Sequence, residues 1–332
     1  MLAWRRKVQL ERVSEDIGRL DGKVALVTGG SRGIGKAVAL ALACRGADVA
    51  VLARTSEAAD PVAAVVRERG RWAVAAGGDV RRWEDVEHLV ATVRGSMGSI
   101  DVLINNAGTG GAHGYVWDLA PEAFQTALLV NVLGPFLFMK AILPEMIGRG
   151  SGVVINVSSG NVRNPGPARS LYGTTKSGLD YLPRAAHQEV APHGVRVHAF
   201  YPGPTDTDMQ AELRSDPALP AEIRAQLQAR HAEGRLFRPE QPAHGMAWLA
   251  SPAGAAWTDS ICPWSNADVR AQTRELARVR LKRGSRCPPD DRAGGVCEVS
   301  SDLHRRPPHA ADCRVAGTDG SPALSGKRAA QD

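Results

Sequence analysis

The segment YGTTK places the phenol of Tyr172 and the ammonium group of Lys176 four residues apart. Side chains at this spacing share one face of a helix. A phenol has an ordinary pKa of about 10 and is a poor acid or base at neutral pH, but a neighbouring positive charge lowers that pKa. Ser159 follows the apolar run VVINV and offers a hydroxyl to a carbonyl oxygen. These residue types predict acid–base chemistry at a carbonyl or an alcohol.

A glycine-rich turn, TGGSRGIG, occupies residues 28–35 between an apolar run and a helical pattern. Its first glycine permits a tight turn, its third permits close approach to a pyrophosphate, and its last lets the helix pack on the strand. The helix N-terminus adds free N–H groups and the positive end of the helix dipole. The turn therefore predicts a dinucleotide site with contacts at Gly29, Ser31, Arg32, Gly33, Ile34 and Gly35.

The residues after the second apolar run predict which nicotinamide cofactor binds. An NAD site has a carboxylate there for the ribose hydroxyls, whereas an NADP site has an arginine for the 2′-phosphate. This chain has Arg54 at that place and no acidic residue before Glu57. Arg32 in the glycine turn is a second candidate, since two guanidinium groups can converge on one phosphate. We expect NADP(H), with NAD(H) as the less favoured cofactor.

The elements that must position these residues alternate along the chain between apolar runs and helical patterns. The runs carry consecutive Val, Leu, Ile or Ala, as strands buried on both faces do. Such alternation predicts an α/β fold with a doubly wound, Rossmann-type parallel sheet of about seven strands. Strands are expected at 23–28, 48–52, 72–76, 102–105, 152–157, 196–201 and 260–262, and helices at 34–45, 61–69, 83–97, 121–147 and 170–193.

Composition narrows the classes of partner and compartment. The chain has 332 residues, 41 Lys and Arg against 35 Asp and Glu, and a formal charge of +6 that is spread rather than gathered in a stripe, so no nucleic-acid partner is expected. The longest apolar run, near residues 127–139, is shorter than the roughly 20 residues of a membrane span, so no membrane partner is expected. Five cysteines without a CxxC pair favour a reducing, cytoplasmic location.

The chain divides into three parts. Residues 1–20 form an N-terminal extension, and residues 21–282 form one catalytic domain. Residues 283–332 lack aromatic residues and contain few large aliphatic ones, which predicts a disordered tail. No metal site is expected in this tail, because its candidate ligands lack the paired cysteines of a zinc finger; these are Cys287, Cys297, His304, His309 and Cys313.

Taken singly, each motif also occurs in ordinary turns and on helix surfaces. In their order and spacing, however, TGGSRGIG, NNAG, Asn131, Ser159 and YGTTK resemble the short-chain dehydrogenase/reductase family over roughly residues 20–280. The resemblance implies hydride transfer between a nicotinamide and a carbonyl or alcohol, in a homodimer or homotetramer. It implies that Tyr172 is the acid/base and that Lys176 binds the nicotinamide ribose. Ser159 would orient the carbonyl, and Asn131 would hold a water in a proton relay.

Further cofactor contacts are expected where other strands end. A carboxylate after the third strand is expected at the adenine, and small residues after the fourth strand let the chain pass close to the cofactor. After the sixth strand, the resemblance implies a turn and a threonine at the nicotinamide carboxamide, with Thr207 the better match. These contacts are Asp79, Val80, Asn106, Ala107, Gly108, Tyr172, Lys176, Pro202, Gly203, Thr205 and Thr207.

Residues 205–240 occupy the place of the family's substrate-covering lid. Met209, Leu213 and Leu236 either face substrate or pack within this lid, and His113 either touches substrate or lies in solvent. Pro183 lies in the helix that carries the tyrosine, where it predicts a kink beyond Lys176. The sequence of this lid does not predict which substrate it covers.

The sequence therefore predicts an NADP(H)-dependent oxidoreductase that interconverts a ketone or aldehyde and an alcohol. The alternative is a cofactor-binding regulator or sensor of the same fold without turnover. Retention of Ser159, Tyr172 and Lys176 together argues against that alternative, because a sensor need not keep all three.

Overall fold

The computed structural model describes residues 18–264 and 269–271. The predicted tail at 283–332, with its candidate metal ligands, and most of the predicted N-terminal extension lie outside this range. Within the described residues, no group of three or more His, Cys, Asp or Glu side chains is placed to hold a metal ion.

Seven parallel strands form one sheet in the order β3-β2-β1-β4-β5-β6-β7. The order reverses between β1 and β4, and this is where a doubly wound sheet opens a crevice at the carboxyl ends of its strands. The predicted fold class is thus confirmed, and every strand end lies within one residue of its predicted position. The strands are β1 (Val24–Thr28), β2 (Asp48–Ala53), β3 (Ala73–Gly77), β4 (Val102–Asn105), β5 (Gly152–Val157), β6 (Val195–Tyr201) and β7 (Ile261–Pro263).

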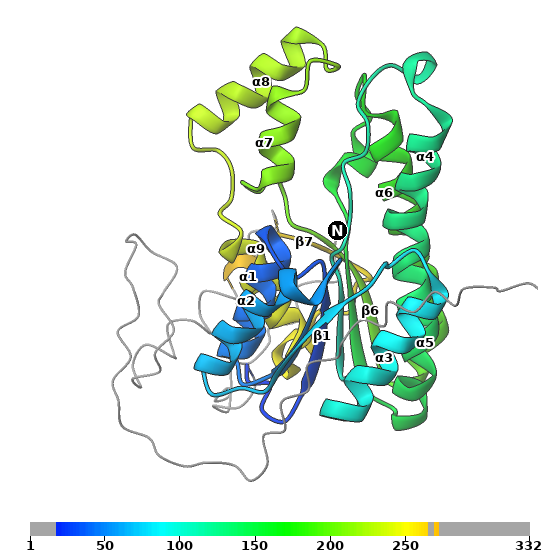
Figure 1. Cartoon of the computed structure of the whole chain (residues 1–332), viewed down its shortest axis with the longest axis vertical. Coiled ribbons are helices and arrows are strands. Elements are labelled where there is room, and N and C mark those ends of the chain that lie inside the picture. The colour runs from blue at the N-terminus through cyan, green and yellow to red at the C-terminus, as the bar shows by residue number, and fades with distance from the viewer. Residues whose placement is uncertain (1–17, 265–268, 272–332) are drawn as a thin grey trace, which may run out of the picture. The chain divides into compact units, whose positions relative to one another are not determined.

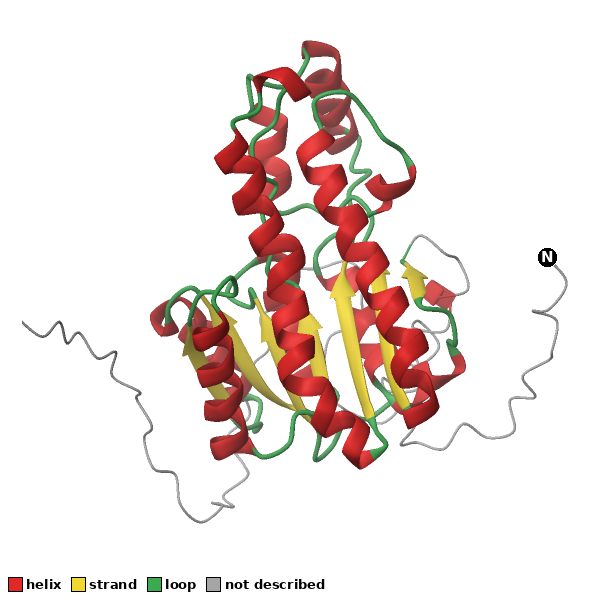
Figure 2. Cartoon of the chain, turned by 90° about the vertical axis from the view of Figure 1, so that its right-hand side faces the viewer, coloured by secondary structure: helices red, strands yellow, loops and turns green. Residues whose placement is uncertain are grey.

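Helices cover both faces of the sheet, so most positions along its strands are apolar. One face packs against α1 (Gly33–Cys44), α2 (Ser56–Glu68) and α9 (Glu240–Ala250). The other face packs against α3 (Trp83–Met97), α5 (Gly134–Arg149) and α6 (Ser170–Val190), which cross in front of the sheet in Figure 2. Pro183 lies inside α6, and the helix continues past it to Val190.

One long helical stretch combines α4 (Pro121–Leu128), a π-helical segment at Leu129–Leu133, and α5. Among the described residues, this stretch is long and apolar enough to cross a membrane by length and composition, and an 18-residue window within it has a mean hydropathy of 1.8. Its α5 part buries Phe138, Ile142 and Met146 completely or almost completely against the sheet and α3. Its apolar composition is therefore explained by its place as a core helix.

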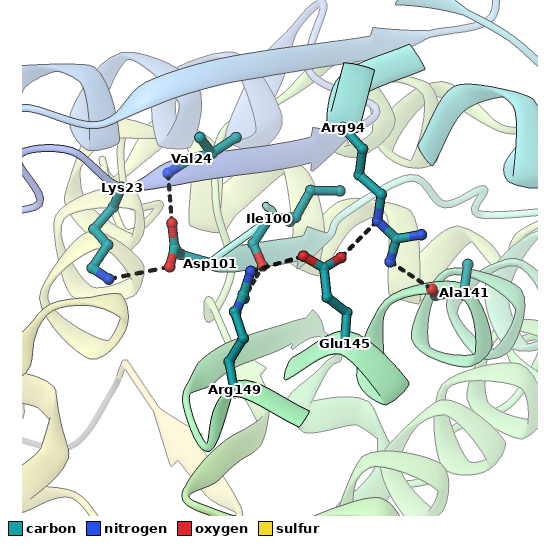
Figure 3. A network of polar contacts seen from close by, with 8 residues as sticks. All are labelled: Lys23, Val24, Arg94, Ile100, Asp101, Ala141, Glu145 and Arg149. Atoms are coloured by element: carbon teal, nitrogen blue, oxygen red, sulfur yellow. Dashed lines mark hydrogen bonds and ion pairs between the residues drawn. The ribbon is translucent and has the colours of Figure 1, made fainter. Parts of the chain in front are cut away.

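A polar network braces the end of the sheet where the strands begin (Figure 3). The carboxylate of Glu145 on α5 lies 2.6 Å from Nε of Arg94 on α3 and 3.0 Å from Nη1 of Arg149. Beside it, Asp101 accepts hydrogen bonds from the backbone N–H of Val24 and from Lys23. The network ties two helices and two strands together away from the carboxyl ends of the strands.

Two helices, α7 (Asp208–Ser215) and α8 (Ala221–Ala232), stand together beyond the carboxyl ends of the strands (Figure 1). The segment that carries them leaves and rejoins the domain at one point, where Thr205 and Phe237 form an isolated β-bridge. Its small apolar cluster buries Leu219 and Leu227 against Ala168, which lies just before α6. These two helices therefore rest on the loop that leads into the tyrosine-bearing helix.

Candidate functional site

The glycine turn and the NNAG turn are bound to each other at the carboxyl ends of β1 and β4. The hydroxyl of Thr28 accepts hydrogen bonds from the backbone N–H groups of Asn106 and Ala107, each at 3.0 Å. The side-chain amide of Asn106 donates to the carbonyl oxygens of Thr28 and Gly29, also at 3.0 Å. A Cβ atom at Gly35 would lie 2.2 Å from the Gly29 oxygen, so only glycine fits there. Two turns that are distant in sequence thus form one surface of close-packed backbone.

The two arginines predicted to bind a 2′-phosphate differ in their surroundings. Nη1 of Arg32 lies 2.7 Å from Oδ2 of Asp208, and the two side chains are 65% and 63% exposed. Arg54 is exposed just after β2, and its side chain has no hydrogen bond or ion pair with any residue that the structure describes. Arg54 is available to an anion as it stands, whereas Arg32 already has an acidic partner.

Asp79 and Val80 follow β3, as predicted, but the carboxylate of Asp79 is occupied. It forms an ion pair with Arg81 at 2.6 Å, and the hydrogen bond from Arg81 holds the pKa of Asp79 below its usual range. Val80 lies against the start of α5, where a Cβ at Gly134 would be 3.2 Å from it. The adenine contact expected of Asp79 stays a prediction.

Tyr172 and Lys176 lie one turn apart on α6, and Nζ of Lys176 is 5.8 Å from the centre of the tyrosine ring. Lys176 is 5% exposed and donates a hydrogen bond of 2.9 Å to the carbonyl oxygen of Val157, at the end of β5. Burial lowers the pKa of Lys176 to about 8. Burial raises the pKa of Tyr172, while a hydrogen bond with Ser159 and the charge of Arg169 act in the opposite direction.

The structure brings Ser159, rather than its neighbour Ser158, to the tyrosine. Oγ of Ser159 accepts a hydrogen bond from the backbone N–H of Asn161. Ser159 thereby caps a short 3-10 helix at Gly160–Arg163. Ser158 is buried, and its hydroxyl has no hydrogen-bond partner among the described residues. The hydroxyl of Ser159 therefore faces the phenol of Tyr172, the arrangement that their spacing predicts.

The side-chain amide of Asn131 makes three hydrogen bonds within the protein. Its Oδ1 accepts from the N–H of Thr109 at 2.8 Å, and its Nδ2 donates to the Thr109 oxygen and to the hydroxyl of Thr175. This side chain fixes the loop that follows NNAG. Asn131 lies in the π-helical segment, a feature often found at functional sites. The proton relay expected at Asn131 stays a prediction.

The turn after β6 leads directly from the sheet into α7. Gly203 has a φ of 74°, and a Cβ there would lie 2.7 Å from the ring of Phe237. Thr205 is buried and donates to the carbonyl of Gly203, whereas Thr207 caps α7 and lies against Gly33 of the glycine turn. Thr207 is thus the threonine next to the glycine turn.

Two residues on the substrate side carry contacts that sequence reasoning missed. Nδ1 of His113 lies 2.7 Å from Oδ2 of Asp216, joining the loop after NNAG to the segment between α7 and α8. Arg169, three residues before Tyr172, is partly buried and acts electrostatically on the phenol. The position of Arg169 just before Tyr172 could have indicated its effect on the phenol. No local sequence pattern indicates that His113 pairs with Asp216.

Comparisons with known proteins agree with this geometry. Residues 23–218 match the family described as short chain dehydrogenase. The chain is 39% identical over 236 residues to the cis-4-hydroxycyclohexanecarboxylate dehydrogenase of Sinomonas cyclohexanicum, covering 70% of this chain and 91% of that protein. It is 37% identical over 241 residues to the 3-oxoacyl-[acyl-carrier-protein] reductase of Synechocystis, covering 72% and 93%.

Solved structures show the same similarity. A 7α-hydroxysteroid dehydrogenase complexed with NADH and 7-oxo glycochenodeoxycholic acid aligns with a TM-score of 0.68 at 28% identity, over 75% of this chain and 95% of that chain. A gluconate 5-dehydrogenase from Burkholderia cenocepacia in complex with NADP and tartrate aligns with a TM-score of 0.67 at 29% identity, with the same coverage.

Proposed function

Because the chain belongs to the short-chain dehydrogenase/reductase family, we propose that it is an NADP(H)-dependent oxidoreductase that interconverts a ketone or aldehyde and an alcohol. Family membership makes it an oxidoreductase that acts on CH–OH groups with a nicotinamide cofactor. The observation that carries the proposal is the meeting of Ser159, Tyr172 and Lys176 at the carboxyl end of the sheet.

The residues present fit a dinucleotide. The cradle at Gly29 and Gly35 leaves no room for a Cβ atom, and it opens onto the N-terminus of α1, which favours a pyrophosphate. The nicotinamide end would lie near Thr207, and the ribose beside Lys176. When bound, the cofactor supplies the hydride that adds to the carbonyl carbon.

Residues of the chain donate the proton to the substrate and replace it afterwards. Ser159 and Tyr172 donate hydrogen bonds to the carbonyl oxygen, which gains negative charge as the carbon is reduced. Tyr172 then gives its proton to that oxygen, so that the product is an alcohol and the phenol becomes a phenolate. The ammonium group of Lys176 stabilises the phenolate, and a proton relay from a water at Asn131 through Lys176 restores the phenol of Tyr172.

Preference for NADP(H) rests on Arg54 and Arg32. Arg54 has no partner among the described residues, and an exposed guanidinium at the end of β2 suits a 2′-phosphate. Arg32 joins it once its ion pair with Asp208 is released or shared. Of the related structures named above, one is complexed with NADH and the other with NADP, so family membership alone does not fix the choice.

The remaining parts of the proposal concern organisation. Residues 21–282 form the catalytic domain, and residues 205–240 form a lid over a small-molecule substrate. Relatives are named for a hydroxycyclohexanecarboxylate and for an acyl-carrier-protein-bound 3-oxoacyl group, so a ring ketone and a 3-oxoacyl chain are the first substrates to compare. The enzyme works as a homodimer or homotetramer in the cytoplasm, without a nucleic-acid partner.

A screen of cofactor oxidation tests this function. The full chain is mixed with NADPH or NADH and with a panel of open-chain and cyclic ketones, and absorbance of the reduced cofactor is followed. We expect ketone-dependent oxidation that is faster with NADPH. Absence of ketone-dependent oxidation with both cofactors, despite measurable cofactor binding, would contradict the proposal.

A further inference from the structure

Arg169 occupies the junction of three elements around the proposed reacting end. It follows Ala168, which packs against the apolar cluster of α7 and α8, and it directly precedes α6. The carbonyl oxygen of Ala168 lies 3.4 Å from the backbone nitrogen of Gly114 in the loop after NNAG. Arg169 therefore lies where the lid, the loop after NNAG and α6 meet.

The side chain of Arg169 is partly buried and has no hydrogen bond or ion pair with any residue in the described part of the chain. Taking a charged group out of water without a partner is costly. Acidic residues are plentiful in the lid, but four of its carboxylates pair with other groups. These are Asp206 with Arg214, Asp208 with Arg32, Asp216 with His113, and Glu233 with Arg235.

A second arginine, Arg230, lies on α8 one turn after Leu227, which packs with Ala168. Burial lowers the pKa of Arg169, and the positive charge of Arg230 on α8 lowers it further, so the two like charges act on each other. Arg230 is exposed and is likewise without a hydrogen bond or ion pair to a described residue. Two guanidinium groups that repel each other are both stabilised when an anion binds between them.

Arg169 is also close enough to the phenol for its charge to lower the pKa of Tyr172. Arg169 caps the start of α6 three residues before Tyr172, so an anion held by Arg169 would lie near the proposed proton donor. A planar guanidinium binds a carboxylate through two parallel hydrogen bonds, which orients the molecule as well as holding it.

We infer that the substrate carries a carboxylate, which Arg169 binds with the help of Arg230 from the lid while the ketone or alcohol lies at Tyr172. This inference rests on the proposed function only in taking Tyr172 as the reacting end. It defines the substrate class as oxo acids and hydroxy acids in which the carboxylate lies apart from the reacting carbon.

Paired substrates test the inference. Oxo acids such as 4-oxopentanoate and 4-oxo ring carboxylates are compared with their methyl esters, using NADPH and the full chain. Since hydrogen bonds to charged groups contribute about 1.5–3 kcal/mol, we expect kcat/KM to favour each acid over its ester by about 10- to 100-fold. Arg169→Met should remove this preference, chiefly by raising KM for the acid, and Arg169→Lys should keep part of it.

Arg235→Met is the matched control, because Arg235 is an exposed lid arginine paired with Glu233. It should leave the ratio of acid to ester unchanged. Arg230→Gln should lower the ratio less than Arg169→Met does. The inference is overturned if Arg169→Met lowers kcat/KM equally for acid and ester, since that result indicates a structural or tuning role only.

A binding measurement keeps the inference testable without turnover. Cyclohexanecarboxylate and its amide cannot be reduced, and their binding to the chain with NADPH is measured by calorimetry. We expect the carboxylate to bind and the amide not to bind, and Arg169→Met to abolish the difference. If no ketone is reduced but this difference is seen, the proposed function fails while the binding of a carboxylate at Arg169 stands. Equal binding of carboxylate and amide to the unsubstituted chain would overturn the inference.

Discussion

Nη1 of Arg32 lies 2.7 Å from Oδ2 of Asp208, so an ion pair joins the glycine turn to the first residue of α7. The pair links the proposed phosphate site to the proposed lid across 176 residues of sequence. Both side chains are mostly exposed, so the pair itself contributes little to stability. Its importance is that Asp208 competes with a 2′-phosphate for Arg32.

Removing this competition should strengthen NADPH binding. An exposed ion pair is worth about 0.2–1 kcal/mol, so Asp208→Asn is expected to lower the Kd for NADPH by up to about 5-fold. The Kd for NADH should not change, because NADH has no 2′-phosphate. Fluorescence titration with both cofactors measures this, with Asp206→Asn as the control in the same segment. Equal effects on both cofactors would show that Arg32 does not meet the 2′-phosphate.

Arg54 should set cofactor preference more strongly than Arg32. Replacing it by Asp removes a charged hydrogen-bond donor and adds a carboxylate that suits the ribose hydroxyls of NAD. Arg54→Asp is expected to shift relative kcat/KM toward NADH by about 10- to 100-fold, the range for hydrogen bonds to charged groups. Steady-state kinetics with both cofactors give the ratio. A ratio that does not move contradicts the assignment of Arg54.

The buried His198 predicts loss of stability in acid. Its side chain is fully buried on β6, Nδ1 lies 2.9 Å from the Asp259 carbonyl oxygen, and burial lowers its pKa to about 3. In the unfolded chain the imidazole takes up a proton near pH 6.5, which the folded chain resists. The free energy of unfolding should therefore fall as pH drops from about 6.5 toward 3, at up to about 1.4 kcal/mol per pH unit.

Urea denaturation at several pH values, compared with His198→Asn, measures this dependence. The asparagine amide can still donate to the Asp259 oxygen, but it does not titrate. We expect the variant to show a shallower fall in stability over the same pH range. Identical pH dependence in both proteins would locate the acid-sensitive group elsewhere.

The brace around Glu145 should matter for stability and not for catalysis. Glu145→Gln leaves the guanidinium groups of Arg94 and Arg149 without a carboxylate, although part of each stays in water. We expect a loss of about 1–2 kcal/mol, below the cost of breaking a fully buried pair, with unchanged kcat and KM. Denaturation and steady-state assays check both parts, and the exposed Glu87→Gln on α3 is the control. A loss of activity at full stability would contradict this role.

Local patterns predicted much of the fold and of the site. Consecutive apolar residues predicted the seven strands because parallel strands are buried on both faces, and the glycine turn was recognised because a strand precedes it and a helix follows it. The choice of Ser159 as the partner of Tyr172 came from the motif spacing of the short-chain dehydrogenase/reductase family. Some strand ends were displaced by one residue, as at Ala73–Gly77, because pairing with neighbours sets them.

Contacts between distant segments could not be predicted in this way. The ion pairs of Arg32 with Asp208 and of His113 with Asp216 depend on how the lid lies against the sheet, which no local spacing encodes. For the same reason, the sequence did not predict the hydrogen bonds of the Asn131 amide, whose partners include Thr175, 44 residues away. Half-burial of Arg169 without a partner is likewise a property of the folded chain.

Tyr172→Phe tests most directly whether Tyr172 is the proton donor, because the substitution removes only the phenolic oxygen. NADPH-dependent ketone reduction is measured beside NADPH binding in the variant and in the unsubstituted chain. Since general acid catalysis contributes about 10²- to 10⁴-fold, kcat should fall by at least about 100-fold while the Kd for NADPH is unchanged. Turnover close to that of the unsubstituted chain would contradict the account.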